Sequence, residues 1–385
     1  MPNHTQLVEN WLRHNNGDAH TSAFECVFYT DSGILGQVEG ECGPYHFLNP
    51  VVSPYRRGVG RVLPAIVLRC YYKREPQAAS HREVPNNSLY HGGWIIEEIA
   101  AISSLFMGIR ILASEITREF HNLELNPTGQ PVGYNHKSPP TLTIHASSTI
   151  LPCAYSPTVN LSALHDAEKV LSLDSDQEIA FIRAARLYQD ALWIAESDPN
   201  MAWLLLVSAI EAVAGCNRIA SATNRELFQQ GYPDLCERLK SEGHAECIDW
   251  LSEHFAPLTK ATQTFINFSL EFLPPAPAER PLEFMRIDWT SGFWKSAFKK
   301  IYAYRSKALH EGTPFPLPMM DPPYLHNNCA VPAEKGTTSL GVRVGNASWE
   351  AADLPINLNL FTQVTRQLIL KWLDRIYHSR SAGAL

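Results

Sequence analysis

The sequence predicts an α+β protein, in which an N-terminal mixed α/β region is followed by an all-α helical bundle. Two observations support this class. Branched and aromatic residues gather between positions 23 and 72, which is typical of β-strands. From Asp174 onward, apolar residues recur at helical spacing. Because the composition changes between these two patterns, we expect an N-terminal domain over 1–160 and a helical domain over 161–385.

The first region is expected to hold a small sheet and one long helix. FECVFYT and ILGQVEG flank a turn at Asp31–Gly33, and VLPAIVLRCYY (62–72) reads as a further strand. Apolar residues at helical spacing predict one long amphipathic helix from Trp94 to Phe120. The proline-rich and glycine-rich segment 126–140 predicts a loop, after which TLTIH (141–145) is compatible with a return to the sheet.

The second region is expected to be a bundle of helices. Asp174 or Ser175 caps the first helix, and Asp198–Pro199 begins the second, which is apolar nearly all round and therefore central. The other predicted helices cover 234–240, 245–255, 258–273, a segment that starts near Asp288 or Thr290 and ends near position 310, and 358–377. A proline-rich break, LPPAPAERP, separates two of them, and 313–355 has the length of a functional or disordered loop.

Composition excludes several classes of protein. The formal net charge of −7 and pI of about 6.1 exclude a broad basic surface, so any polyanion site must be local. The chain has no signal-peptide pattern at its start and no apolar run of membrane-spanning length, which predicts a cytoplasmic protein without a membrane partner. The eight cysteines form no zinc pattern, and the motifs of serine hydrolases, P-loop NTPases and zinc proteases are missing, so no metal and no cofactor are expected.

The segment 301–312, IYAYRSKALHEG, carries an unusual pair of charged side chains. Helical geometry places Arg305 on one stripe with Trp294, Phe298 and Ile301. A buried guanidinium needs a carboxylate, a phosphate or a second subunit beside it. His310 follows at the predicted helix end, where it can face solvent. The spacing R-x4-H alone is weak, because similar spacings occur at Arg13/His20, Arg74/His81 and Arg238/His244.

The sequence around this pair resembles HEPN domains, most closely the ApeA-like HEPN group of phage-defence proteins. The resemblance is carried by YRSKALHEG, by YQDAL and LLLVSAIEAV about a hundred residues upstream, and by ASWEAADLPINLNLFTQVTRQLILKWLDRI near the C-terminus. It covers roughly residues 165–385 and implies that the helical domain is a HEPN bundle. It also implies a metal-independent endoribonuclease, a toxin or abortive-infection effector, that acts on RNA such as tRNA as a homodimer.

The resemblance also implies a role for each site residue. Arg305 would hold the scissile phosphate, and His310 would act as the general acid or base at the ribose 2′-hydroxyl or the leaving oxygen. Glu211 would orient Arg305 across the bundle, while Ser306 and Lys307 would add contacts to phosphate. The products would carry a 2′,3′-cyclic phosphate and a 5′-hydroxyl.

Each role has a structural alternative. Arg305 and Glu211 can form a buried ion pair without catalysis, and His310 can serve as a helix cap. Ser306 and Lys307 can be solvated, and Tyr302 and Tyr304 are most simply packing residues. The matching alternative for the whole chain is a non-catalytic HEPN scaffold for dimerisation. In both cases, the N-terminal domain would bind a regulatory ligand or partner.

Overall fold

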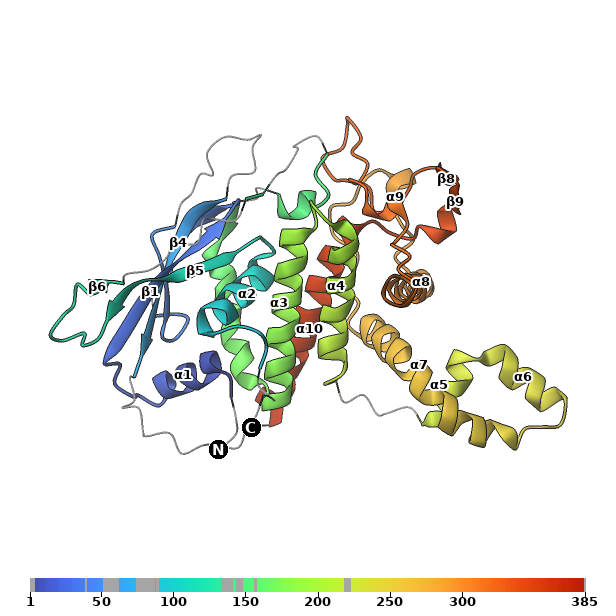
Figure 1. The fold of residues 1–385 in the computed structure, drawn as a ribbon, viewed down its shortest axis with the longest axis horizontal. Helices are drawn as coiled ribbons and strands as arrows, with labels where there is room; N and C mark the ends of the chain where they lie inside the picture. The colour runs from blue at the N-terminus through green and yellow to red at the C-terminus, as the bar shows by residue number, and fades with distance from the viewer. Residues whose placement is uncertain are drawn as a thin grey trace.

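The computed structural model describes residues 4–38, 40–50, 62–73, 87, 90–132, 141–142, 148–155, 158–217 and 223–383. An antiparallel sheet forms one side of the protein, and a set of helices from the C-terminal part forms the other (Figure 1). Helix α2 (Ile95–Met107) lies between the sheet and helix α3 (Ser175–Ile194). The predicted mixture of an N-terminal sheet region with C-terminal helices is therefore confirmed.

The main sheet has the strand order β3-β4-β1-β5-β6, and each of its pairs is antiparallel. Its strands are β1 (Ser22–Thr30), β3 (Tyr45–Leu48), β4 (Leu63–Tyr72), β5 (Leu112–Phe120) and β6 (Gln130–Pro131). The strands expected before and after the turn at position 31 do not pair with each other. Instead, β2 (Gly33–Leu35) pairs in parallel with β7 (Thr158–Asn160). Helix α1 (Gln6–Asn15), which was not predicted, packs against α2.

The prediction of one helix from Trp94 to Phe120 is wrong. Helix α2 ends at Met107 because Gly108 adopts a left-handed conformation (φ 69°) that glycine accepts at little cost. The chain then continues as β5, which pairs along β1. Residues 143–145 of the expected strand TLTIH lie outside the described residues, and 141–142 have no regular structure.

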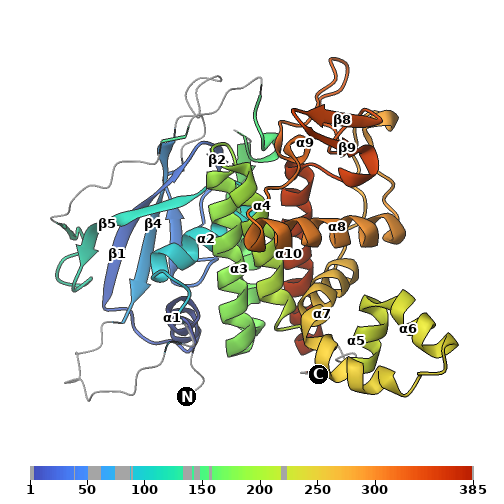
Figure 2. The same cartoon turned by 45° about the vertical axis from the view of Figure 1, so that its right-hand side comes forward.

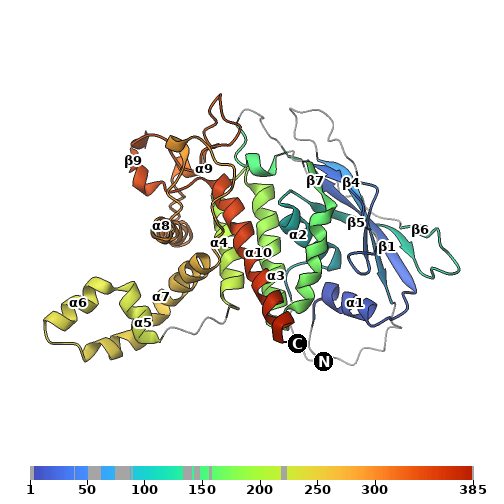
Figure 3. The same cartoon turned by 180° about the vertical axis from the view of Figure 1, so that it is seen from behind.

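The central helices follow the prediction. Asp174 caps α3 and accepts a hydrogen bond from the Gln177 backbone (3.0 Å), while Asp198 caps α4 (Pro199–Ala214). Trp203 of α4 is fully buried between the rings of Phe315 and Phe361. The last helix, α10 (Leu358–Gly383), lies beside α3 and α4 when the protein is seen from behind (Figure 3). Helix α4 is therefore central, as its apolar sequence indicates.

An arm of three helices projects away from this body (Figures 1 and 3). It consists of α5 (Asn224–Gly231), α6 (Pro233–Ser241) and the first half of α7 (Cys247–Glu271). A small separate core of Phe228, Cys236 and Ile248 holds it together. The prediction of two helices at 245–255 and 258–273 is wrong, because α7 continues through Pro257. Proline weakens a helix by one hydrogen bond, and packing of α7 against α5, α4 and α8 outweighs that loss.

Helix α8 (Ser291–His310) lies crosswise to α4 and α10 (Figure 2). Thr290 caps its first turn. The segment that follows holds α9 (Leu317–Met320) and the β8–β9 hairpin (Gly341–Val344 and Ala347–Glu350). The described residues also contain four 3-10 segments, of which the second is twelve residues long: Pro152–Ala154, Leu161–Ser172, Glu283–Met285 and Ala351–Asp353. Within the described ranges, no helix has the length and apolar character needed to cross a bilayer.

The buried core is continuous across residue 160. One cluster of buried side chains includes residues of α1, the sheet, α2, α3, α4, α8 and α10. Phe106 of α2 and Phe181 of α3, for example, lie with ring centroids 6.3 Å apart. The division into domains at residue 160 stays a prediction from composition.

Candidate functional site

The R-x4-H pair lies on the C-terminal half of α8. Trp294, Phe298 and Ile301 are fully buried, and Arg305 follows on the same face with 21% of its side chain exposed. The guanidinium therefore lies at the edge of the core rather than inside it. This position agrees with the helical stripe read from the sequence.

Arg305 is paired with the carboxylate that the sequence analysis named. Its Nη2 donates to Oε2 of Glu211 on α4 at 2.8 Å, and the Tyr302 hydroxyl donates to Oε1 of the same carboxylate at 2.8 Å. The guanidinium also lies 5.5 Å from the centroid of the Tyr302 ring. Arg305 Nε is buried and has no acceptor among the residues that the structure describes. The structure thus brings Glu211, Tyr302 and Arg305 together, while the catalytic roles of Glu211 and Arg305 stay predictions.

The environment keeps Tyr302 protonated. Burial, the hydrogen bond to Glu211 and the charge of Glu211 together raise the pKa of Tyr302 to about 12, although Arg305 and a hydrogen bond with Thr262 oppose this. At neutral pH the phenol is therefore a firm donor to Glu211. The carboxylate is held by two donors from α8, which fixes α8 against α4.

A cavity of about 330 Å³ opens beside this cluster, between α4 and α7. Glu211 forms part of its wall, and Lys260 and Thr264 of α7 supply its other polar side chains. The remaining lining is small or apolar: Ala214, Gly215, Ala261 and Phe265. A phosphate group could enter here beside one lysine and near Arg305.

His310 is the last residue of α8, and its side chain is exposed. Neither a hydrogen bond nor an ion pair involves its imidazole within the part of the chain that the structure describes. Backbone atoms end the helix, since Glu311 N–H donates to Lys307 O and Gly312 is left-handed (φ 68°). No hydrogen bond within the described residues therefore supports the alternative in which the His310 side chain caps the helix.

One protomer does not bring Arg305 and His310 to a common point. Five residues along an α-helix correspond to a rotation of roughly 140° and a rise of about 7.5 Å. Arg305 faces α4, whereas His310 faces solvent on another side of the helix. A site that uses both residues requires a second chain or a substrate that reaches around α8.

The exposed side of α8 is basic. The helix carries Lys295, Lys299, Lys300, Arg305 and Lys307 and no acidic residue, in a chain whose net charge is negative. Helical spacing places Lys295, Lys299, Ser306 and His310 within one stripe, with exposed Lys307 beside it. We call these five residues the basic stripe of α8. Such a surface is a candidate for the local polyanion site that the overall composition leaves open.

Sequence analysis missed two members of this site. Tyr302 was interpreted as a packing residue, yet its hydroxyl binds Glu211. Its position three residues before Arg305 puts both on one face, and this spacing was the available signal. Lys260 gave no signal, because its proximity to Glu211 depends on how α7 packs against α4.

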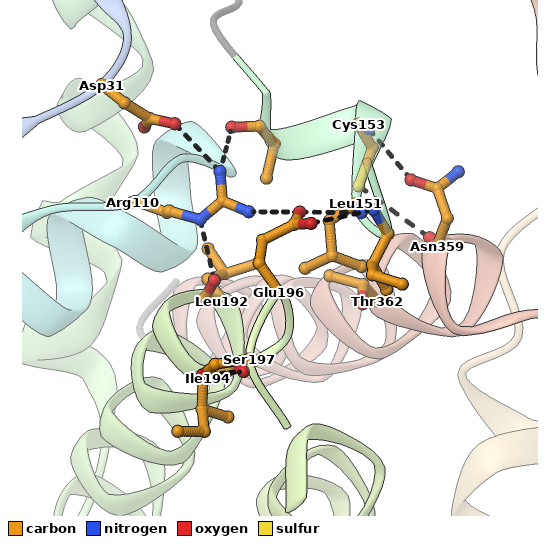
Figure 4. A network of polar contacts seen from close by, with 12 residues as sticks. Asp31, Arg110, Leu151, Cys153, Leu192, Ile194, Glu196, Ser197, Asn359 and Thr362 are labelled. Carbon is orange, nitrogen blue, oxygen red and sulfur yellow. Dashed lines mark hydrogen bonds and ion pairs between the residues drawn. The ribbon is translucent and has the colours of Figure 1, made fainter. Parts of the chain in front are cut away.

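A second arginine cluster lies between the sheet and the helices (Figure 4). Arg110, between α2 and β5, is completely buried. Its Nη1 donates to Asp31 Oδ2 at 2.9 Å and its Nη2 to Glu196 Oε1 at 3.1 Å. It also donates to the carbonyls of Leu192 (2.8 Å) and Ala154 (3.2 Å). The sequence analysis did not identify this cluster.

The Arg110 cluster joins four parts of the fold. Asp31 follows β1, Glu196 follows α3, and Glu196 also accepts the backbone N–H groups of Ile150 and Leu151. Burial raises the pKa of Asp31, while the charge of Arg110 opposes that shift. Its complete burial makes this cluster a structural connection without access for a substrate.

No protein-family model, curated protein or solved structure matches this chain. The likeness to HEPN domains therefore depends on the sequence segments quoted above.

Proposed function

We propose that this protein is a HEPN-type endoribonuclease that cleaves RNA without a metal ion and acts as a toxin or anti-phage effector. The observation that carries the proposal is the arrangement of α8. Its buried face holds Arg305 against Glu211, and its exposed face presents an acid-free basic stripe that ends in His310. Each side of this helix offers a group suited to a phosphodiester.

In this proposal His310 moves protons and Arg305 stabilises charge. The imidazole of His310 is exposed, and histidine is the side chain that most often transfers a proton from a 2′-hydroxyl or to a leaving 5′-oxygen. Arg305 is oriented by Glu211 and keeps N–H groups that have no recorded acceptor, so it can hold a phosphate. Lys295, Lys299, Ser306 and Lys307 attract the RNA backbone.

The active form in this proposal is a homodimer. Because Arg305 and His310 face different directions on one helix, we propose that Arg305 of one chain works with His310 of its partner. The cytoplasm is the proposed location. The N-terminal region serves as the regulatory part, because a free ribonuclease would harm its host.

A non-catalytic scaffold is the second candidate. It is favoured by one observation: the recorded contacts of Arg305 are an intramolecular ion pair with Glu211 and the face of Tyr302, as in a purely structural cluster. In this case α8 fixes the bundle, and the basic stripe binds a partner without cleaving it.

Cleavage of total RNA and tRNA in EDTA distinguishes the two candidates. We expect the wild-type protein to leave 2′,3′-cyclic phosphate ends, and His310→Ala to lose cleavage by about 10²- to 10⁴-fold, the usual contribution of an acid-base residue. His378→Ala is the matched control, since His378 is also exposed near the end of a helix, α10. It should cleave like the wild type.

Mixing variants tests the shared site. Arg305→Ala and His310→Ala proteins, each inactive alone, should regain part of the cleavage after co-refolding, because one mixed site then holds both residues. Cleavage unaffected by His310→Ala would overturn the catalytic assignment. A wild-type protein that binds RNA but leaves it intact would support the scaffold.

A further inference from the structure

A cavity of about 610 Å³ lies near the junction of the sheet region and the helices. It lies away from the Arg305 cluster and shares no lining residue with the cavity beside Glu211. Its walls come from the end of α2, from α10 and from the proline-rich segment Pro274–Ala278. Cavities of this volume hold small organic molecules.

Arg366 is the single charged residue among the described residues that line this cavity. Its Nε donates to Leu105 O at 2.6 Å, and its Nη2 donates to Phe106 O. Both acceptors are carbonyls at the end of α2, and no carboxylate of the described residues forms an ion pair with the guanidinium. The helix end offsets about half a unit charge, which leaves a net positive potential. Nη1 has no acceptor among the described residues.

The other polar groups of the cavity are neutral. Tyr188 is 2% exposed, and no hydrogen bond of its hydroxyl is recorded in the described part of the chain. Burial raises its pKa, so it is a phenol and a donor. Burial also raises the pKa of Cys153 to about 12, which makes it an uncharged thiol. Gln363 and Gln367 add amides from α10.

The remaining lining is apolar. It consists of Met107, Val159, Trp289, Leu360, Val364 and the segment Pro274–Ala278. An anion without apolar parts would leave these walls unfilled, and a neutral apolar molecule would leave Arg366 Nη1 and the Tyr188 phenol without an acceptor. The ligand must therefore have both an acidic group and an apolar body.

We propose that this cavity binds a small organic monoanion with an apolar body, its acidic group at Arg366 and Tyr188 and its body against the Pro274–Ala278 segment. The ligand would contact the end of α2 and the face of α10 at once. It would thereby connect the N-terminal region with the helical region. This inference is independent of ribonuclease activity.

Two fluorescent probes test the charge requirement. 1-Anilinonaphthalene-8-sulfonate has an aromatic body and one sulfonate, and N-phenyl-1-naphthylamine has the same body without charge. We expect the wild-type protein to bind the sulfonate at one site, roughly tenfold more tightly than the neutral probe. Arg366→Gln should remove this preference and leave the neutral probe nearly unchanged.

Two further variants complete the test. Ala276→Trp fills the cavity from the Pro274–Ala278 segment and leaves Arg366 in place, so it should weaken both probes by at least about tenfold. It also decides the question if Arg366→Gln fails to fold. Arg380→Gln, an exposed arginine on α10, should bind both probes like the wild type. Equal sulfonate binding by wild type and Arg366→Gln, or by wild type and Ala276→Trp, would overturn the proposal.

Discussion

The clusters around Arg110 and Arg305 use the same kinds of residue in opposite ways. Arg110 is completely buried and donates to two carboxylates and two carbonyls. Arg305 has 21% of its side chain exposed, and Glu211 is the one acceptor recorded for it among the described residues. Four of the five N–H groups of Arg110 have acceptors and its side chain has no access to solvent, whereas Arg305 keeps N–H groups without an acceptor among the described residues and is partly exposed. Burial and unused donors, rather than residue type, separate a structural arginine from a candidate site.

The surroundings of the carboxylates agree with this distinction. Burial raises the pKa of Asp31 next to Arg110, and Asp31 Oδ1 has no hydrogen-bond partner within the described part of the chain. Glu211 receives one donor on each oxygen and borders a cavity that can admit a small group. The buried Arg110 cluster therefore needs every one of its charged side chains to stay neutralised. In the Arg305 cluster, a ligand that enters the cavity could replace one of the contacts.

Loss of Arg110 should therefore have the largest effect on stability. Arg110→Met leaves Asp31 and Glu196 buried without their cation, and such a change costs about 3–5 kcal/mol. Urea unfolding followed by circular dichroism measures the loss.

A triple variant sharpens this prediction. Asp31→Asn and Glu196→Gln, added to Arg110→Met, remove both unpaired charges while keeping an acceptor for the N–H groups of Ile150 and Leu151. The triple variant should be more stable than Arg110→Met alone. If the single variant loses under about 1 kcal/mol, the cluster is not the structural connection described here.

Loss of Arg305 should have a small effect on stability and a large effect on RNA cleavage. Because the ion pair with Glu211 is partly exposed, Arg305→Met should reduce the free energy of unfolding by about 1 kcal/mol or less. RNA cleavage should fall by about 10²- to 10³-fold, as expected for removal of a charge-stabilising donor.

Arg305→Lys is the matched control, because it keeps the charge without the forked donors and should recover only part of the cleavage. If Arg305→Met loses as much stability as Arg110→Met and still cleaves RNA, Arg305 has a structural role and no role in catalysis.

The sequence predicted those parts of the fold that depend on local signals. Helices α3, α4, α8 and α10 each combine an apolar stripe with a polar cap or a proline start, so their positions follow from neighbouring residues. The strand β5 could not be found in this way. Its residues also fit helical spacing, and its pairing with β1, some ninety positions earlier, decides its structure.

The difference between local signals and long-range packing also explains which site residues the sequence analysis found. Glu211 and Arg305 each interrupt an apolar helix face, so each is a visible exception that requires a partner. Arg110 is also an exception in an apolar segment, but its partners lie 79 and 86 positions away in the chain. Glu211 and Arg305 are 94 positions apart, and the resemblance to HEPN domains is what linked them in the sequence analysis. The resemblance gives Arg110 no role, so only the packing of α2, α3 and the sheet reveals its partners.

Tyr302 gives the smallest and most specific test of the Arg305 cluster. Tyr302→Phe removes the hydrogen bond to Glu211 and should cost about 1 kcal/mol at pH 7. Free energies of unfolding of both proteins, measured by urea titration at several pH values, give the difference. Tyr304→Phe is the control, because the Tyr304 hydroxyl donates to the Asp353 carbonyl instead of a carboxylate.

The pH dependence of this difference has a defined sign. The pKa of Tyr302 is about 12 in the folded protein and about 10 in an unfolded chain, so the folded state holds the proton more tightly. The stability that Tyr302 contributes is complete below pH 10 and is lost as the pH rises toward 12, where a phenolate faces the Glu211 carboxylate. The wild type should therefore lose its advantage over Tyr302→Phe across this range. A difference that stays constant from pH 7 to 11 would show that the phenol does not interact with Glu211 in solution.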